Sequence, residues 1–194
     1  KHLDRIIPFL KREEPNVICL QELYAKDVSL FESELGMQSV YEALQLWPDE
    51  DPKPLGIGIF SKLPFSNVEK EYYYGKPGDL RSERGEPDST NRCLLSLEVQ
   101  ALDDISYRIG TTHFTWSPKG EPNDKQREHL TAFLQLLQNH KEIVFCGDLN
   151  APRGGEIFER FAARYTDWIP KHYLSSIDGQ FHRAGALPYM VDGL

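Results

Sequence analysis

Eight consecutive residues, Ile143 to Asn150, carry the strongest chemical signal in the chain. The first four of them, Ile-Val-Phe-Cys, are apolar and suit a strand that is covered on both faces. Gly147 follows and predicts that another part of the chain approaches closely there. Asp148 and Asn150 stand two positions apart, so in an extended chain their side chains point to the same side. A carboxylate and a carboxamide at the carboxyl end of a core strand suit metal-assisted attack on a phosphate.

Two further strand-like runs also end in side chains that can do chemistry. Residues 17–20 are apolar and lead to Glu22, and residues 105–110 alternate apolar and polar residues before His113. Packing alone does not easily explain three strands that each end in an acid, an amide or an imidazole.

A hard divalent cation takes oxygen ligands and usually keeps several waters. Glu22, helped by Asp148 or Asn150, therefore makes a plausible Mg²⁺ site, at which Mn²⁺ is a substitute.

The elements that must position these side chains follow from hydrophobic periodicity. It predicts helices at residues 2–13, 26–35, 124–139 and 156–165. It predicts strands at residues 17–20, 38–46, 56–60, 93–99, 105–112 and 143–146, and one that ends at Tyr74. Residues 75–90 have no periodicity, so we expect a mobile, functional loop there.

Composition places the chain among ordinary globular proteins. Of its 194 residues, 40% are hydrophobic and 27% are charged, so we expect one compact domain over residues 1–194. No run approaches the roughly 20 apolar residues that a membrane-spanning helix needs. The formal net charge of −8 argues against a general polyphosphate-binding surface, although a local basic groove remains compatible with it.

The three cysteines, Cys19, Cys93 and Cys146, all lie inside apolar runs. Their odd number favours buried, reduced thiols over a disulfide framework, so we expect a cytoplasmic protein. Because Lys1 is not an initiator residue, a preceding signal peptide is also compatible with the sequence. No protein partner can be deduced.

Four short motifs together resemble a known family. They are Leu20-Gln21-Glu22, Thr112-His113-Phe114, Gly147-Asp148-Leu149-Asn150-Ala151-Pro152 and Met190-Val191-Asp192-Gly193. In this order they resemble the signature set of the endonuclease/exonuclease/phosphatase superfamily, which includes deoxyribonuclease I and exonuclease III. The resemblance covers nearly the whole chain. However, the family's opening strand, which bears an Asn, and its closing Ser-Asp-His segment have no counterpart here, so we expect the functional protein to be longer at both ends.

The resemblance implies a fold and an activity. The fold is α/β (α+β), a four-layer α-β-β-α sandwich of two mostly antiparallel or mixed sheets flanked by helices. The activity is that of a Mg²⁺-dependent phosphoester hydrolase, with a nuclease or phosphodiesterase as first choice and nucleic acid as a candidate substrate. The alternatives are a phosphatase or phospholipase-type member acting on inositol phosphates or lipids, and a non-catalytic relative with a binding function.

The resemblance also implies a role for each motif residue. Glu22 and Asp148 would hold the metal, and Asp148 would also be the general base. Asn150 would hold the phosphate by hydrogen bonding. His113 would protonate the leaving oxygen or contact the phosphate, and Asp192 would orient a catalytic His in the segment that has no counterpart here. From the residues alone, these groups also fit an Asx turn, a hydrogen-bonded core histidine and a turn carboxylate.

Substrate binding is the least specific expectation. Arg81, Arg84, Asn91 and Arg92 cluster in or beside the irregular segment, where guanidinium groups suit a phosphate. A solvated charged loop is the alternative for Arg81 and Arg84. We expect Arg127 to make a structural ion pair.

Overall fold

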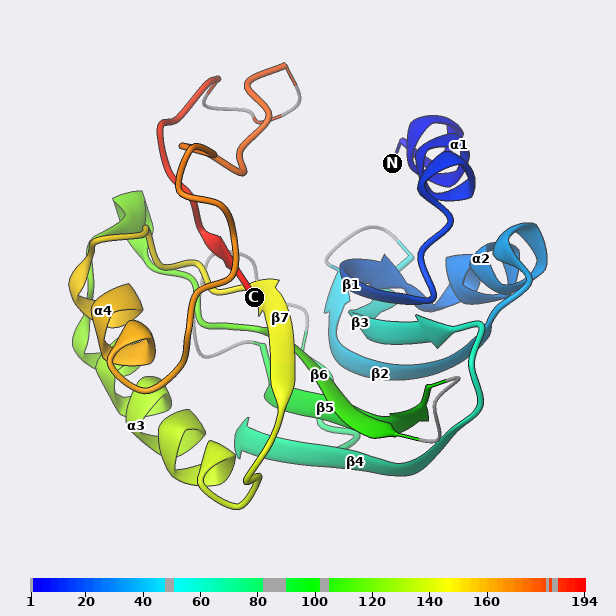
Figure 1. Cartoon of the computed structure of the whole chain (residues 1–194). Coiled ribbons are helices and arrows are strands. Elements are labelled where there is room, and N and C mark those ends of the chain that lie inside the picture. Colours follow the sequence, from blue (N-terminus) through cyan, green and yellow to red (C-terminus); the bar gives the residue numbers. More distant parts are fainter. Residues whose placement is uncertain (1, 48–50, 82–89, 102–104, 181, 183–184) are drawn as a thin grey trace.

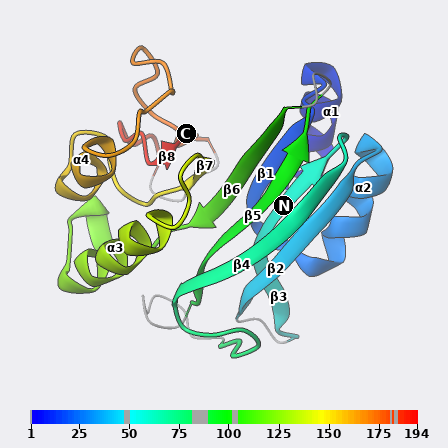
Figure 2. The same cartoon turned by 60° about the horizontal axis from the view of Figure 1, so that its bottom comes forward.

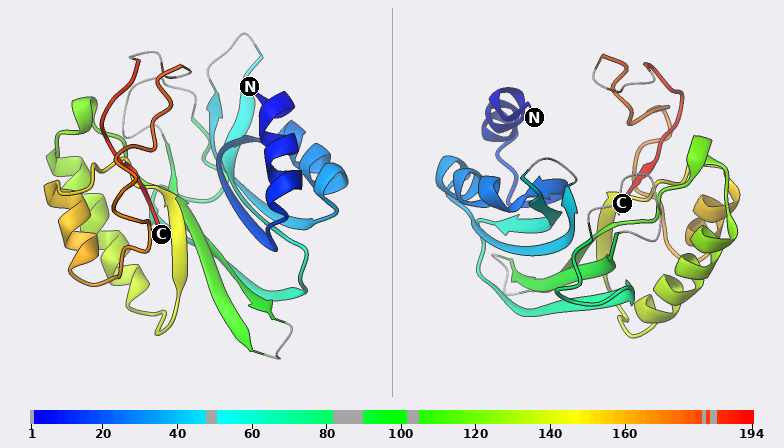
Figure 3. Two further views of the ribbon diagram at one scale, coloured as in Figure 1. Left: turned by 45° about the horizontal axis from the view of Figure 1, so that its top comes forward. Right: turned by 180° about the vertical axis from the view of Figure 1, so that it is seen from behind.

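The computed structural model describes residues 2–47, 51–81, 90–101, 105–180, 182 and 185–194. Within these residues, two stacked β-sheets form the middle of the molecule and helices cover their outer faces (Figures 1 and 2). This arrangement confirms the predicted α-β-β-α sandwich. Figure 3 shows from two further sides that α1 and α2 lie at one end of the stack, while α3 and α4 lie at the other.

The smaller sheet has three strands in the order β1-β3-β2, all antiparallel. This sheet and the helices beside it comprise, in chain order, α1 (Leu3–Glu13), β1 (Val17–Tyr24), the short 3-10 helix η1 (Ala25–Asp27), α2 (Val28–Leu35), β2 (Gln38–Trp47) and β3 (Lys53–Ser61). The two helices pack on its outer face, where Phe31 of α2 meets Phe60 of β3 with ring centroids 5.6 Å apart. A side chain at Gly56 would clash with the carbonyl oxygen of Glu42, 1.9 Å away, so this glycine lets β2 and β3 pair closely.

The larger sheet has five strands in the order β4-β5-β6-β7-β8. This sheet and the helices beside it comprise, in chain order, β4 (Phe65–Tyr74), β5 (Arg92–Gln100), β6 (Ser106–His113), the 3-10 turn η3 (Pro118–Gly120), α3 (Asp124–Leu137), β7 (Val144–Asp148), α4 (Glu156–Ala162) and β8 (Asp192–Gly193). Only the pair β6–β7 is parallel. The segment between α4 and β8 returns to the end of β7 (Figure 1).

Two apolar layers hold the sheets and helices together. Between the sheets, Ile57 and Ile59 of β3 pack against Leu95 and Leu97 of β5. Outside the larger sheet, the apolar stripe of α3 is fully buried; it consists of Leu130, Phe133, Leu134 and Leu137. Burying side chains of this size contributes about 1.5–3 kcal/mol each.

The predicted helices and strands agree with the structure to within a few residues at their ends, with one difference in burial. The strand at residues 143–146 was expected to be covered on both faces, but the side chain of Val144 is 46% exposed. The reason is topological. On its outer side, β7 pairs with β8 only at Gly147 and Asp148, so its first half is a sheet edge.

Parts of two loop predictions lie outside the described residues. Within the irregular segment, residues 82–89 are not described, and the same holds for residues 102–104 in the hairpin turn. The three cysteines are free thiols, with Cys93 buried and the other two half-buried. Among the described residues, no helix has the length and apolar character needed to cross a membrane.

Candidate active site

Three of the predicted residues lie side by side across the larger sheet. In the parallel pair β6–β7, His113 stands opposite Asp148, and in the antiparallel pair β7–β8, Asp148 stands opposite Asp192. Residues directly opposite one another point to the same face of a sheet. The chain therefore builds a row of one imidazole and two carboxylates where β6 and β7 end.

Gly147 makes this row possible. A side chain at this position would lie 1.9 Å from the carbonyl oxygen of Thr112 on β6. Only glycine allows β7 to approach β6 so closely just before Asp148, as the sequence predicted.

Glu22 reaches the row from the opposite sheet. The register between β1 and β3 shifts between Leu20 and Leu23, so Gln21 and Glu22 form a bulge, and Glu22 has φ of 52°. The side-chain nitrogen of Gln21 donates a hydrogen bond of 2.7 Å to the hydroxyl of Thr111 on β6. This bond ties the bulge to the larger sheet. A bulge is a common device for re-aiming a side chain near an active site.

The electrostatics show that the acids share one space. Burial, followed by the charge of Asp192 and then by that of Glu22, raises the pKa of Asp148 to about 7, although its bond from the backbone N–H of Asn150 acts in the opposite direction. Burial also raises the pKa values of Glu22 and Asp192 above their ordinary values. A carboxyl group with a pKa near neutrality is suited to acid–base catalysis.

His113 is kept neutral. Burial, with a smaller effect from the positive charge of Arg92, lowers its pKa to about 3. Its Nε2 atom lies 3.6 Å from Oδ2 of Asp148. The two side chains therefore do not form a charged pair at neutral pH, and a proton added to this pair resides on Asp148.

Asn150 does not continue the strand. Its φ is 48°, and its backbone N–H donates to Oδ1 of Asp148 over 2.8 Å, which is an Asx turn. The expectation of an extended chain with both side chains on one side was thus wrong for Asn150. Its side-chain nitrogen donates to the carbonyl oxygen of Phe114 over 3.0 Å, so the turn fixes the amide beside the row.

Asn91 and Arg92 form hydrogen bonds within the protein and are not open to a substrate. Both side chains are buried, with 6% and 3% of their surface exposed. Asn91 donates to the carbonyl oxygens of Lys76 and Asp79. Asn91 therefore anchors the loop that contains Lys76 and Asp79, and we do not place it as a substrate contact.

Arg92 supports the row through the backbone of the row. Its Nη1 atom donates to the carbonyl oxygens of His113 and Phe114 over 2.8 and 3.0 Å. The Phe114 carbonyl is the one that also accepts from Asn150, so Arg92 and Asn150 hold the same peptide. Because its guanidinium group is enclosed and Nη1 already donates to two carbonyl oxygens, we disfavour Arg92 as a direct phosphate contact, although its buried Nε has no hydrogen-bond partner within the protein.

The remaining arginines lie elsewhere. Arg81 is exposed and pairs with Asp79 at 3.1 Å. Arg84 lies outside the described residues. Arg127 forms the expected structural ion pair, with Glu156 at 2.7 Å.

Sequence reasoning missed one residue that positions the site. Gln126 of α3 is 1% exposed, and its side-chain nitrogen donates to the carbonyl oxygens of Thr115 (2.9 Å) and Asn150 (3.1 Å). It thus clamps together the loops that follow β6 and β7. A signal was present, because Gln126 is a polar residue on the same helical stripe as the buried Leu130 and Phe133.

The residues present fit a hard divalent cation. Glu22 and Asp148 offer oxygen ligands. Burial raises the pKa values of Glu22, Asp148 and Asp192, and the charges of Asp192 and Glu22 raise that of Asp148 further, so a cation would stabilise the ionised acids. In the described part of the chain, the only three His, Cys, Asp or Glu ligand atoms within 4.8 Å of one another belong to a different group. No three ligand atoms from the row and Glu22 therefore lie that close together, so a cation held by Glu22 and Asp148 would need waters as further ligands.

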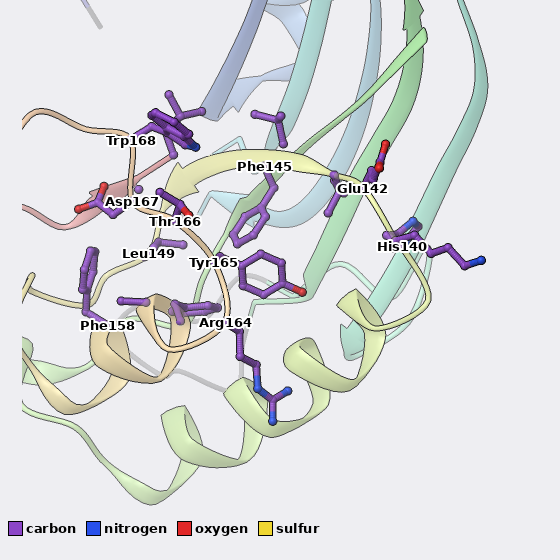
Figure 4. A pocket seen from close by; sticks show the side chains of 17 residues that line it. His140, Glu142, Phe145, Leu149, Phe158, Arg164, Tyr165, Thr166, Asp167 and Trp168 are labelled. Atoms are coloured by element: carbon purple, nitrogen blue, oxygen red, sulfur yellow. The ribbon is translucent and has the colours of Figure 1, made fainter.

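A separate pocket lies on the other face of β7. It has a volume of about 320 Å³ and lies between β7 and α4, where Phe145, Phe158 and Trp168 line it (Figure 4). Neither Glu22 nor Asp148 lines it. Because Phe145 and Asp148 point to opposite faces of β7, the pocket is separate from the row.

Comparisons with solved structures agree with the fold. ANGEL2, a 2',3'-cyclic phosphatase, in complex with adenosine-2',3'-vanadate, is 19% identical, with 82% of this chain and 47% of that chain covered and a TM-score of 0.61. A mannosyl-6-phosphatase from Bacteroides thetaiotaomicron is 12% identical, with 81% and 60% covered and a TM-score of 0.57. Identities this low show the fold alone. The chain spans about half the length of ANGEL2.

No curated protein sequence matches the chain at a significant level. A sequence profile described as the Endonuclease/Exonuclease/phosphatase family matches residues 1–189, which is nearly the whole chain. The row His113–Asp148–Asp192, its bulge-borne Glu22 and the two-sheet sandwich are all consistent with this match. The chain belongs to the endonuclease/exonuclease/phosphatase family, whose members hydrolyse phosphoester bonds.

Proposed function

We propose that this protein hydrolyses phosphoesters with the help of a divalent cation held by Glu22 and Asp148. One observation carries the proposal. Burial raises the pKa of Asp148 most, and the negative charges of Asp192 and then of Glu22, which come from two different sheets, raise it further. Side chains from distant parts of the sequence therefore share one space, and that space has the charge and the oxygen ligands that such a cation needs.

The protein's own residues would divide the work as follows. Asp148 takes a proton from the attacking water through Oδ2, because Oδ1 is engaged by the Asn150 N–H. Burial raises the pKa of Asp148 to about 7 in the metal-free protein, and a bound cation would lower it from there. The water oxygen forms a bond to phosphorus, and the bond from phosphorus to the leaving oxygen breaks. The leaving oxygen keeps the electron pair of that bond and takes up a proton from solvent water. Asn150 has a free side-chain N–H with which to bind a phosphate oxygen, since its other N–H is held by Phe114.

Neutral His113 would donate a hydrogen bond to the phosphate instead of supplying a proton. Its low pKa means that almost no imidazolium exists at neutral pH. Asp192 acts on Asp148 through its charge. When bound, Mg²⁺ or Mn²⁺ supplies polarisation of a phosphoryl oxygen, which typically contributes several kcal/mol.

The substrate class is a further proposal. A nuclease or phosphodiesterase remains a candidate, but Arg92 is enclosed, Arg81 is paired and the net charge is −8. These features favour a small phosphoester over a long polyphosphate strand, because strand binding depends on free basic residues. A phosphatase is therefore the second candidate. The two phosphatases among the similar solved structures are consistent with it.

A substrate panel tests the proposal. The protein is assayed with a generic phosphodiester, a generic phosphomonoester, single- and double-stranded DNA, RNA and inositol phosphates, each with Mg²⁺, with Mn²⁺ and with EDTA. We expect metal-dependent hydrolysis of at least one substrate, lost in Asp148→Asn and retained in Asp4→Asn, a change at an exposed acid of α1. Equal hydrolysis by wild type and Asp148→Asn would contradict the proposal.

A further inference from the structure

A second group of metal-ligating side chains lies outside the candidate active site. Glu69 and Glu71 of β4 and His140, which follows α3, place one ligand atom each so that all three atoms lie within 4.8 Å of one another. The Nε2 atom of His140 is 2.6 Å from Oε2 of Glu71 and 4.0 Å from Oε2 of Glu69. We propose that these three residues form a binding site for a divalent transition-metal ion, with Zn²⁺ as its representative.

The backbone fixes the three donors independently. Glu69 and Glu71 are two apart in a regular stretch of β4, so both side chains project toward the face that α3 covers. His140 is held in the turn after α3 by a bond from its N–H to the carbonyl oxygen of Leu137. Its side chain is only 7% exposed. The imidazole is therefore directed at the two carboxylates by the fold, and not by a chance surface rotamer.

The donor set matches a borderline cation. One imidazole nitrogen and two carboxylate oxygens are the ligand types that Zn²⁺ and its neighbours accept, and a fourth position is left for water. The three residues open into a pocket of about 360 Å³ that Asn139, Lys141 and Glu142 also line. A water or a small ligand atom can therefore complete the coordination. Because Zn²⁺ bonds are about 2.0–2.2 Å long, His140 would move slightly away from Glu71.

A competing cation is already beside the group. Arg108 approaches Glu69 at 3.2 Å, but its other bonds are to Glu98 at 2.7 Å and to the hydroxyl of Ser96 at 3.2 Å. Arg108 can therefore release Glu69 and keep two partners. Glu71 has no such partner in the ion pairs of the described residues except His140, so its charge is not otherwise balanced there.

The group is distinct from the candidate active site. Strand pairing aligns Glu69 with Ser96, Gly110 and Phe145 across the larger sheet. Phe145 lies three residues before Asp148 along β7. Phe145 and Asp148 point to opposite faces of the sheet. Figure 4 shows His140 at the beginning of β7, away from the arrowhead where that strand ends. An ion there would tie β4 to the connection between α3 and β7 without touching the catalytic row.

The decisive experiment measures Zn²⁺ binding in a protein whose active-site ligands are removed. In the double variant Glu22→Gln/Asp148→Asn, equilibrium dialysis with Zn²⁺ should find about one bound ion per chain. Adding His140→Gln or Glu71→Gln should weaken this binding at least about 100-fold, because loss of an outer-shell partner alone costs about 10–100-fold. Glu142→Gln, in the same pocket but outside the triad, is the matched control and should bind as before.

Thermal unfolding gives a second readout that is independent of activity. Zn²⁺ should raise the melting temperature of the double variant and of the Glu142→Gln control, but not that of the His140→Gln protein. If His140→Gln fails to fold, Glu69→Gln replaces it, since Glu69 is 42% exposed and tolerates an amide. Either no Zn²⁺ binding by the double variant or equal binding with and without the triad would overturn the proposal.

Discussion

Oδ2 of Asp148 lies 3.6 Å from Nε2 of His113, at the ends of two adjacent parallel strands. This distance is short enough for an ion pair. However, burial raises the pKa of Asp148 and lowers the pKa of His113, and both shifts favour the neutral forms. Asp148 has a pKa of about 7 and His113 of about 3. The carboxyl group is thus the base of the pair, and the imidazole is a neutral neighbour.

The first prediction concerns the base itself. Asp148→Asn keeps the size of the side chain and an acceptor for the Asn150 N–H, so the fold should persist. Turnover should fall by about 10²–10⁴-fold, the usual contribution of a general base. Steady-state kinetics beside circular dichroism spectra check this. A folded variant with activity close to wild type would remove Asp148 from the mechanism.

The second prediction concerns pH and stability. Folding raises the pKa of Asp148 from 3.8 to about 7, so the folded state binds the proton more tightly than the unfolded state. This favours folding fully below about pH 3.8, and the advantage is lost as the pH rises through about 7. Without divalent cations, the free energy of unfolding should therefore fall by on the order of 4 kcal/mol more in wild type than in Asp148→Asn over this range.

Urea denaturation at a series of pH values measures this difference directly. Adding Mg²⁺ at pH 8 should restore part of the lost stability, because the cation binds the ionised acids of the folded protein. Identical pH slopes for wild type and Asp148→Asn would mean that the carboxyl group is not buried among like charges.

The third prediction concerns His113. Because burial lowers its pKa to about 3, its imidazole should stay neutral through pH 5. Nitrogen chemical shifts of the histidine side chains, assigned with a His113→Gln variant, report this without any assay of activity. Titration of His113 near pH 6.5, the ordinary value for an imidazole, would restore it as a candidate proton donor.

The fourth prediction concerns the clamp made by Gln126. Gln126→Ala removes two hydrogen bonds and leaves the buried carbonyl groups of Thr115 and Asn150 without this donor. Each unsatisfied group costs about 1–3 kcal/mol, so loss of the donor to two groups should lower the free energy of unfolding by about 2–6 kcal/mol. The kcat should also fall, because the loop bearing Asn150 is released. Gln135→Ala, at an exposed position of the same helix, is the control and should change stability by less than about 0.5 kcal/mol.

Much of the fold could be predicted from periodicity and motif order. The stripe from Leu130 to Leu137 predicted α3, and alternation predicted β5 and β6 almost to the residue. Edge position could not be predicted, because it depends on which strand pairs beside β7. Val144 therefore looked like a core residue although nearly half of its side chain is exposed.

The site was predictable where strand ends carry it and unpredictable where buried polar contacts support it. Their places at the ends of strand-like runs singled out Glu22, His113 and Asp148, and the family resemblance added Asp192. The register brings His113, Asp148 and Asp192 into one row. Arg92 was expected to face a substrate, because a sequence does not show that its guanidinium group meets two carbonyl oxygens.

The central claim is that Glu22 and Asp148 bind one cation together, and a double-mutant cycle of Mn²⁺ binding tests it most directly. Binding to wild type, Glu22→Gln, Asp148→Asn and the double variant is measured by electron paramagnetic resonance, each in a His140→Gln background. Shared ligation predicts that either single change abolishes most binding and that the second adds little. Additive losses, or tight binding that persists in both single variants, would contradict the account.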